Sequence, residues 1–236
     1  MLWYKAWLET RARFLTSLAT LTIFCAVFVG HAQRLIRPQW KSDFNRLLFV
    51  NQQFVVIIWI LAVVLLGMGG IVREKVIGTS SLTLSLPVSR ARLLSIRVGM
   101  GVMQAVALAV VPWITVFVVS WLAGKPIGID QIRSYVLLLI GGGLVYFAMA
   151  VLVSSLVAGE YTAPALATGL VLLAAIVFDA WLRRFNLWRL VTGDLSIDRS
   201  TFLLSRHLPL PGILASLLIA ALLVLASVLI VRRRDF

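Results

Sequence analysis

The stretch REKVIGTSSLTLSLPVSRAR, residues 73–92, lies between the second and third long apolar runs of the chain. Its charged and hydroxyl-bearing side chains make it too polar for the hydrocarbon core of a bilayer, whereas the apolar runs on either side are suited to cross one. Gly78 permits a sharp turn, after which Thr79 or Ser80 can cap a short helix. Pro87 can end that helix. These residues predict a structured loop at the membrane surface, with a short helix lying parallel to the membrane.

The apolar runs around this loop define the fold class. The 236-residue chain is 61% hydrophobic and only 13% charged, whereas a soluble domain is closer to half apolar and a quarter charged. A backbone in lipid has to satisfy its own hydrogen bonds, so each run predicts a helix. We expect an all-α integral membrane protein with a single transmembrane domain over residues 1–236. Its six transmembrane helices are predicted at residues 14–30, 54–72, 98–121, 135–157, 164–181 and 211–231.

The residues before the first span have an amphipathic pattern. Trp3 and Trp7, four residues apart among several basic residues, fall on one face of a helix. Residues 1–13 therefore predict an interfacial helix, and the alternative is an ordinary basic flank of the span. The basic start, the apolar run and the small-residue pattern Gly30-His31-Ala32 also have the form of a secretory signal. We interpret the segment as the first span.

Small and polar residues within the spans indicate how the helices pack. Gly141-Gly142-Gly143 in the fourth span predicts close helix contacts, with a hinge or a pore-lining position as the alternative. Pro112 predicts a kink in the third span, and Ser89 can cap the helix that contains it. Gln104 is one of few polar residues inside the spans, and ionisable residues there are nearly absent. This composition argues against a proton-driven transporter and favours an apolar or amphipathic substrate.

The basic residues indicate the surroundings of the chain. Lys and Arg number 22 against 9 acidic residues, and they cluster in loops beside the apolar spans. Membrane lipids with anionic headgroups are therefore the expected partners, and no nucleic acid is expected. Eleven basic residues fall on each side of the six-span arrangement, so the positive-inside rule does not give the orientation. An even number of spans places both termini on one side.

Two stretches carry a resemblance to a known family. Glu74, Gly78-Thr79 and the run Ser85-Leu86-Pro87-Val88-Ser89-Arg90 resemble the cytoplasmic loop of ABC transporter permeases of the type-2 exporter family. The ending Arg232-Arg233-Arg234-Asp235-Phe236 is similar to the usual C-terminus of that family. The resemblance implies a multi-pass protein of a bacterial or archaeal cell membrane with cytoplasmic termini. It also implies an amphipathic elbow helix at the N-terminus, a coupling helix between spans 2 and 3, and small extracellular helices between spans 5 and 6.

The same resemblance implies which residues contact an ABC ATPase subunit. In the loop between spans 2 and 3 they are Glu74, Gly78, Thr79, Leu82, Leu86, Pro87, Ser89 and Arg90. Glu160, in the short connection 158–163, is a further candidate, with a solvated turn as the alternative. The implied complex contains two ATPase subunits and a second copy of this permease or a related permease. No cofactor or metal is expected.

The polar segment 182–210 between the last two spans has an apolar pattern of its own. Several apolar residues stand among its basic residues and predict a short amphipathic helix dipping into the outer leaflet. They are Phe185, Leu187, Trp188, Leu190 and Val191.

The predicted function is half of the translocation pathway of an ATP-binding-cassette exporter. The sequence has no Gly-x-x-x-x-Gly-Lys-Ser/Thr motif, so we expect a non-catalytic chain whose energy comes from ATP hydrolysis in a partner subunit. A membrane enzyme is disfavoured because His31 and His207, the only histidines, have no ligand-like neighbours at short spacing. The alternative is a structural or sensory membrane subunit of an ATPase-linked complex. No sequence pattern indicates the substrate.

Overall fold

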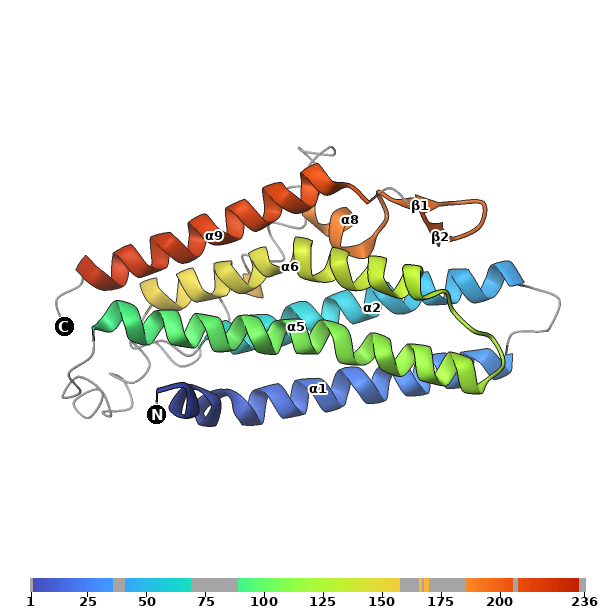
Figure 1. Cartoon of the computed structure of the whole chain (residues 1–236), viewed down its shortest axis with the longest axis horizontal. Helices are drawn as coiled ribbons and strands as arrows, with labels where there is room; N and C mark the ends of the chain where they lie inside the picture. The colour runs from blue at the N-terminus through green and yellow to red at the C-terminus, as the bar shows by residue number, and fades with distance from the viewer. Residues whose placement is uncertain are drawn as a thin grey trace.

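The computed structural model describes residues 2–35, 41–68, 89–157, 166, 168–169, 186–205 and 208–233. Five long helices lie side by side in an elongated bundle (Figure 1). They are α1 (Leu2–Leu35), α2 (Lys41–Gly67), α5 (Arg90–Leu122), α6 (Ile129–Leu156) and α9 (Leu210–Arg233). Between α6 and α9 the chain forms the short helix α8 (Leu187–Thr192) and an antiparallel hairpin of β1 (Ile197–Asp198) and β2 (Leu203–Leu204).

The described part of the chain confirms the all-α membrane class. All five long helices are long and apolar enough to cross a membrane, judged by length and composition. They coincide with the predicted first to fourth and sixth spans. The predicted fifth span, residues 164–181, lies almost entirely outside the described residues and stays a prediction. The end of α6 and the start of α9 lie at different positions along the bundle (Figure 1), as a further crossing between them requires.

Three helices begin well before the apolar runs that predicted them. α2 begins at Lys41 rather than residue 54, α5 at Arg90 rather than residue 98, and α6 at Ile129 rather than residue 135. The helices are longer than the predicted spans because hydropathy marks the lipid-compatible part of a helix, whereas the helix continues where its side chains have protein partners. Gln52, for example, is fully buried in α2. α5 continues through Pro112, and the kink expected there stays a prediction.

The N-terminal residues do not form a separate elbow helix. α1 is continuous from Leu2 to Leu35, so these residues are the first turns of the helix that contains the first span. The Trp7 ring packs edge-on against Phe14, with 5.7 Å between ring centroids. Trp3 lies beside α5, 3.0 Å from the position that a Cβ would take at Gly99. The predicted elbow was wrong because this end of α1 packs along α5.

The three glycines in the middle of α6 let three other elements approach it. A Cβ at Gly141 would stand 2.6 Å from Ile213 of α9, and one at Gly142 would stand 2.7 Å from Val191 of α8. A Cβ at Gly143 would meet the indole ring of Trp59 of α2. Distances this short leave no room for a side chain. The predicted role in close packing is confirmed, and α6 lies at the centre of the bundle.

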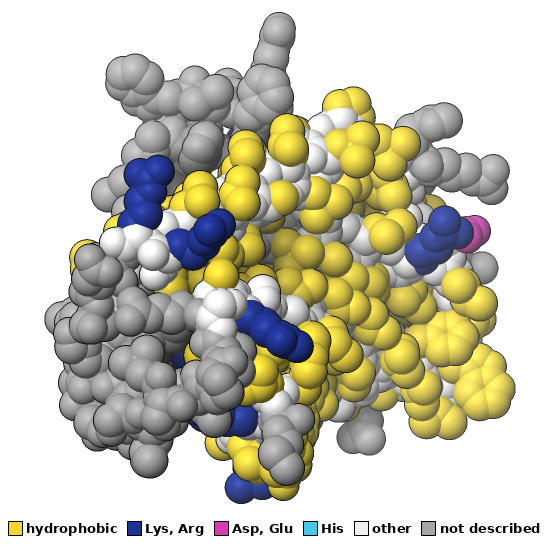
Figure 2. All heavy atoms as spheres, turned by 60° about the vertical axis from the view of Figure 1, so that its left-hand side comes forward, with side chains coloured by type: hydrophobic (Ala, Val, Ile, Leu, Met, Phe, Trp, Pro, Cys, Tyr) yellow, Lys and Arg dark blue, Asp and Glu magenta, His cyan; other side chains and the backbone are white. Residues whose placement is uncertain are grey.

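The outer surface of the bundle is largely apolar. Hydrophobic side chains cover the middle of the face shown in Figure 2, and most of the Lys and Arg side chains in that view lie toward its left. The exposed large hydrophobic side chains of α9 are mostly leucines, among them Leu210, Leu214, Leu218, Leu222, Leu225 and Leu229. Such a continuous apolar surface suits lipid hydrocarbon rather than water.

Candidate functional site

The candidate site lies at the end of the bundle where α1 begins, α2 ends, α5 begins, and α6 and α9 end (Figure 1). We call it the terminal end. The loop predicted to contact an ATPase connects α2 to α5 at this end. Its expected contact residues Glu74, Gly78, Thr79, Leu82, Leu86 and Pro87, and also Glu160, lie outside the described residues. The structure therefore shows the helices that hold the loop.

Ser89 forms the N-cap of α5, as predicted. Its hydroxyl oxygen accepts a hydrogen bond from the backbone N–H of Arg92 at 3.4 Å, and its carbonyl accepts one from Leu93 at 3.1 Å. The residue has an extended backbone (φ −64°, ψ 142°), as N-cap residues usually do. Arg90, another predicted contact, is the first residue of α5. The position at which the loop becomes a helix is thus defined by a local hydrogen bond.

Arg13 of α1 binds the end of α2, from which the loop continues. Its Nη1 donates hydrogen bonds to the carbonyl oxygens of Leu65 at 3.1 Å and Met68 at 3.3 Å. The last carbonyls of a helix have no partner within it, and a cation there also interacts favourably with the helix dipole. Gly67 packs against α6, with only 2.9 Å from its Cβ position to the Cβ of Ala150. The end of α2 is held by α1 and by α6.

The first turns of α1 also hold the start of α5. Arg97 Nη2 lies 2.8 Å from Glu9 Oε2, and the two side chains are 15% and 32% exposed. About two turns farther along α5, Gln104 Nε2 donates to the hydroxyl of Thr10 at 2.8 Å. Lys5 lies 3.8 Å from the same Glu9 carboxylate. Polar contacts from one helix therefore reach both helices that flank the loop.

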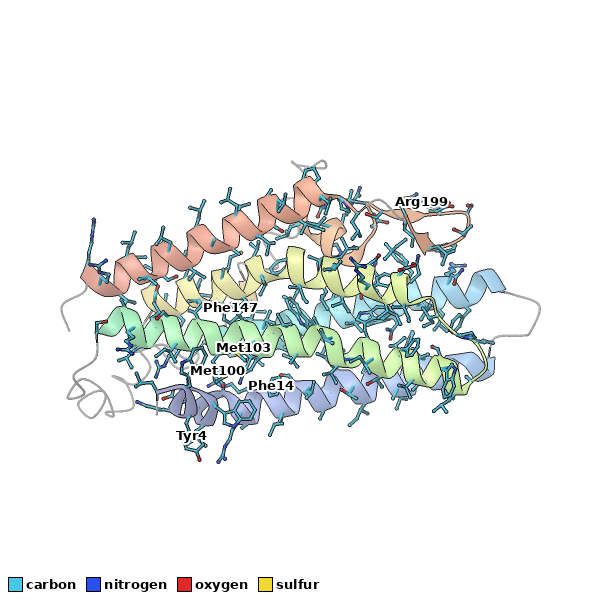
Figure 3. The ribbon with its side chains drawn as sticks, in the orientation of Figure 1. Tyr4, Phe14, Met100, Met103, Phe147 and Arg199 are labelled. Carbon is cyan, nitrogen blue, oxygen red and sulfur yellow. The ribbon has the colours of Figure 1, made fainter. Side chains whose placement is uncertain are left out.

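Apolar packing completes this connection. Figure 3 shows Met100 and Met103 of α5 on the side of α1, near Phe14, and Phe147 on α6. A Cβ at Gly101 would stand 2.5 Å from a ring carbon of Phe147, so α5 and α6 approach very closely there. Phe147 is 2% exposed. Close-packed interiors transmit displacement rather than absorb it, so α1, α2, α5 and α6 are expected to move together at the terminal end.

α8 packs on the middle of α6, and the hairpin lies at the opposite end of the bundle against the first turns of α2 and α6. The side chain of Asn186 caps α8 by accepting the N–H of Arg189 at 3.2 Å, and Gly193 ends the helix with φ +82°. Leu190 and Val191 are buried against α6. The expected helix is present, and Leu190 and Val191 pack at Gly142 of α6; its position relative to the outer leaflet stays a prediction. The small extracellular helices implied by the resemblance are here one described helix and a hairpin.

Side-chain hydrogen bonds fix the hairpin on the bundle. Gln131 of α6 pairs with the backbone of Leu204 through both amide atoms, at 3.1 and 3.0 Å. Asn45 of α2 donates to the carbonyl of Thr201 at 3.0 Å. Within the turn, hydrogen bonds from the Ser200 hydroxyl and backbone N–H lower the pKa of the Asp198 carboxyl below its usual range.

Two buried polar residues of α2 were not recognised in the sequence as part of a helix core. Asn51 and Gln52 precede the apolar run, and both are fully buried. Gln52 Nε2 donates to the carbonyl of Val191 at 3.0 Å, whereas the Asn51 side chain has only the Cys25 thiol of α1 as a neighbouring partner, and its amide atoms make no hydrogen bond of standard geometry among the described residues. The only sequence feature that could have indicated their burial was the apolar residues on both sides of the pair. Within the described residues, no group of three or more His, Cys, Asp or Glu side chains is placed to hold a metal ion.

Comparison with known proteins places the chain in a family. A family model described as ABC-2 family transporter protein matches residues 15–186, which is well over half of the chain and includes the loop between α2 and α5. No curated protein and no solved structure matches the chain. Members of such a family associate with an ABC ATPase. With five helices suited to cross a membrane, the chain belongs to the ABC-2 transporter family and is a multi-pass membrane permease of an ABC transporter.

Proposed function

We propose that this chain is the permease subunit of an exporter, that it forms half of the translocation pathway, and that its loop between α2 and α5 couples it to a separate ATPase subunit. The observation that carries the proposal is the set of contacts made by the first turns of α1. Arg13 holds the end of α2, and Glu9 holds the start of α5. A force applied to the loop would therefore reach three helices at once.

The proposed complex has two permeases and two ATPase subunits, with the terminal end of each permease in the cytoplasm. ATP-driven closure of the ATPases would move the loops and tilt the two bundles against each other. The chain itself would be non-catalytic. Because the spans contain almost no ionisable residues, we expect the exported substrate to be apolar or amphipathic. Stimulation of ATPase activity by candidate lipids or hydrophobic dyes in the reconstituted complex tests this expectation, and no response to any of them would contradict it.

The coupling itself is tested by co-purification from native membranes. The tagged chain is expected to bring down an ABC ATPase, and the loop variants Glu74→Lys and Gly78→Pro are expected to lose it. Arg133→Gln is the matched control, because Arg133 is an exposed cation on the first turns of α6 at the opposite end. If the ATPase is retained by both loop variants, the loop is not the coupling site.

A second measurement distinguishes docking from transmission. Arg13→Gln removes the hydrogen bonds to the end of α2 but leaves the loop sequence intact. We expect this variant to bind the ATPase normally and to show weaker substrate stimulation of ATP hydrolysis. Normal stimulation would mean that the contacts of α1 do not transmit the motion. An ATPase that binds without any transport would favour the alternative, a structural or sensory subunit.

A further inference from the structure

The end of the bundle opposite the terminal end contains a cavity of about 220 Å³. Its walls come from the first turns of α2 and α6, from the connection between α5 and α6, and from the hairpin. An engineered protein cavity of about 150 Å³ is large enough to bind benzene. The cavity can therefore hold an aromatic ring together with a short alkyl segment.

The apolar walls of the cavity are aromatic and well supported. Phe44, Tyr135 and Phe202 all line it. The ring of Tyr135 stacks on Trp113 of α5 at 4.6 Å between centroids and 5° between planes, and Tyr135 is 2% exposed. This wall is therefore fixed before any ligand enters, which lowers the entropic cost of binding.

Phe202 reaches the cavity from a strained backbone. Its φ is +54°, and among the described residues it is the only one other than glycine with a positive φ. A bulky residue in this left-handed region is an outlier that persists only where the surrounding structure requires it. The ring lies 6.5 Å from that of Phe49 of α2, measured between centroids. The strained backbone of the hairpin thus lies at Phe202, the residue whose aromatic ring forms part of the cavity wall.

Two cations stand beside the same aromatic walls. Lys125 Nζ lies 5.8 Å from the centroid of the Phe44 ring, and Arg46 Cζ lies 5.8 Å from that of Phe202. Neither cation has a carboxylate partner among the described residues. None of the lining residues is acidic, and Asp130, in the first turn of α6, is exposed and does not line the cavity. Lys125 and Arg46 do not line the cavity either, and Asp198 is a further exposed carboxylate of the hairpin, so the two cations are distinguished by their contacts with the Phe44 and Phe202 rings.

The first turn of α6 also lies beside the cavity. Gly128, the N-cap residue of α6, lines the cavity and provides no side-chain cap for the free N–H groups of that turn. Backbone N–H groups at a helix start favour negative charge. Asp130 already supplies a negative charge in this turn, so the two cations are the features that favour a bound anion beside the aromatic cavity.

We propose that this cavity binds an anionic amphiphile, with its ring or alkyl part between Phe44, Tyr135 and Phe202 and its carboxylate or phosphate facing Lys125 and Arg46. The site lies at the end of the bundle opposite the loop that is proposed to couple to the ATPase, and binding to it can be measured without the ATPase. Two sources share the chemistry, namely an anionic lipid of the surrounding membrane and a free anionic amphiphile.

The test uses the full chain in nanodiscs of zwitterionic phosphatidylcholine, with empty nanodiscs subtracted. The probe is 4-phenylbutyrate, and its amide and the corresponding amine are the matched neutral and cationic compounds. Isothermal titration calorimetry should show the carboxylate binding more tightly than both. Lys125→Gln should weaken carboxylate binding by about fivefold and leave amide binding unchanged, because a partly exposed charge contact is worth up to about 1 kcal/mol. Arg133→Gln is the control cation and should change nothing.

Two further variants test the cavity itself. Gly128→Leu adds a side chain where no atom lies within 4 Å of the new Cβ, and its φ of −63° suits any residue. Phe202→Asn removes the ring but tolerates a positive φ. Both should abolish binding of the carboxylate and of the amide. Replacing part of the phosphatidylcholine by phosphatidylglycerol should weaken probe binding if lipid is the natural occupant and should have no effect if it is a free amphiphile.

Several outcomes would overturn the proposal. They are no binding of 4-phenylbutyrate by the wild-type chain, equal binding of the carboxylate and the amide, and full binding by Gly128→Leu. Size-exclusion profiles of the variants in nanodiscs identify any that fail to fold, and the comparison of the three probes on the wild-type chain is independent of them.

Discussion

The ion pair between Glu9 and Arg97 provides the most direct test of how α1 and α5 are held together at the terminal end. The distance between Glu9 Oε2 and Arg97 Nη2 is 2.8 Å, and the side chains are 32% and 15% exposed, respectively. An exposed ion pair contributes up to about 1 kcal/mol, whereas breaking a fully buried pair costs about 3–5 kcal/mol. Because this pair is partly buried, we expect a coupling energy of about 1–2 kcal/mol between the two side chains.

A double-mutant cycle of Glu9→Gln and Arg97→Gln measures this energy. Arg97 has interactions besides the one with Glu9, and Lys5 also lies near that carboxylate, so each single variant loses more than the pair. The cycle cancels those additional losses. The readout is hydrogen exchange of the backbone amides of residues 93–98 in nanodiscs, where about 1–2 kcal/mol corresponds to about a 5- to 30-fold change in the opening equilibrium.

The expected result is that the double variant exchanges little faster than the more affected single variant. Raising the salt concentration should reduce the coupling energy, because part of the pair is accessible to ions. Arg133→Gln, at the opposite end of the bundle, should leave these amides unchanged. Additive losses in the double variant would show that the two side chains act independently, and the contact between α1 and α5 would then not depend on this pair.

Three further changes test packing, buried polarity and pH dependence. Gly101→Ala is expected to lower the unfolding temperature in a fluorescence assay, because the new Cβ would stand 2.5 Å from an aromatic ring carbon on α6. Gly30→Ala, whose nearest neighbour is a methyl carbon at 3.7 Å, is the matched control and is expected to stabilise by up to about 1 kcal/mol. Asn51→Leu is expected to raise the unfolding temperature, because burying a poorly satisfied amide costs about 1–3 kcal/mol and a thiol is a weak partner; a decrease would show that the contact with Cys25 outweighs this cost. The hydrogen bonds from Ser200 lower the pKa of the Asp198 carboxyl. Their stabilisation of the hairpin is therefore fully present above the unfolded-state pKa of about 4. It is lost as the pH falls through the lower folded-state pKa. Exchange of the hairpin amides should therefore accelerate only in acid, and Asp198→Asn should remove that dependence.

Hydropathy was sufficient to predict the five long helices that the structure describes, because a lipid-spanning backbone has few alternatives to a helix. It could not predict where the helices begin. α2 starts well before its apolar run, and part of the reason is that the Gln52 amide bonds to the carbonyl of Val191, which is 139 residues away. No local pattern contains that information. Ser89, in contrast, was predicted as a cap because a cap involves residues only three apart.

The terminal end shows the same difference between contacts that a local sequence pattern predicts and contacts between distant residues. The sequence showed Glu9, Arg13 and Arg97 only as charges flanking apolar runs. Their contacts join residues 52 to 88 positions apart in the chain, and such pairs depend on how the helices are arranged in space. The tryptophans at positions 3 and 7 led to the elbow prediction for the same reason, since an amphipathic face indicates a partner but does not say whether that partner is lipid or protein.

α5 connects the two proposed sites. Arg97, near its start, binds α1 at the terminal end, and Trp113, sixteen residues later, stacks on the tyrosine that forms a wall of the cavity. Sixteen residues of helix span about 24 Å. A displacement of α5 by the ATPase would move the Trp113 ring and the cavity wall behind it, so the affinity for an anionic amphiphile should differ between nucleotide states. Titration of 4-phenylbutyrate into the permease–ATPase complex, with and without a non-hydrolysable ATP analogue, measures that difference. Thermodynamic linkage requires each of two coupled sites to respond to the other. Equal affinities in the two nucleotide states would therefore show that the cavity and the terminal end are energetically independent.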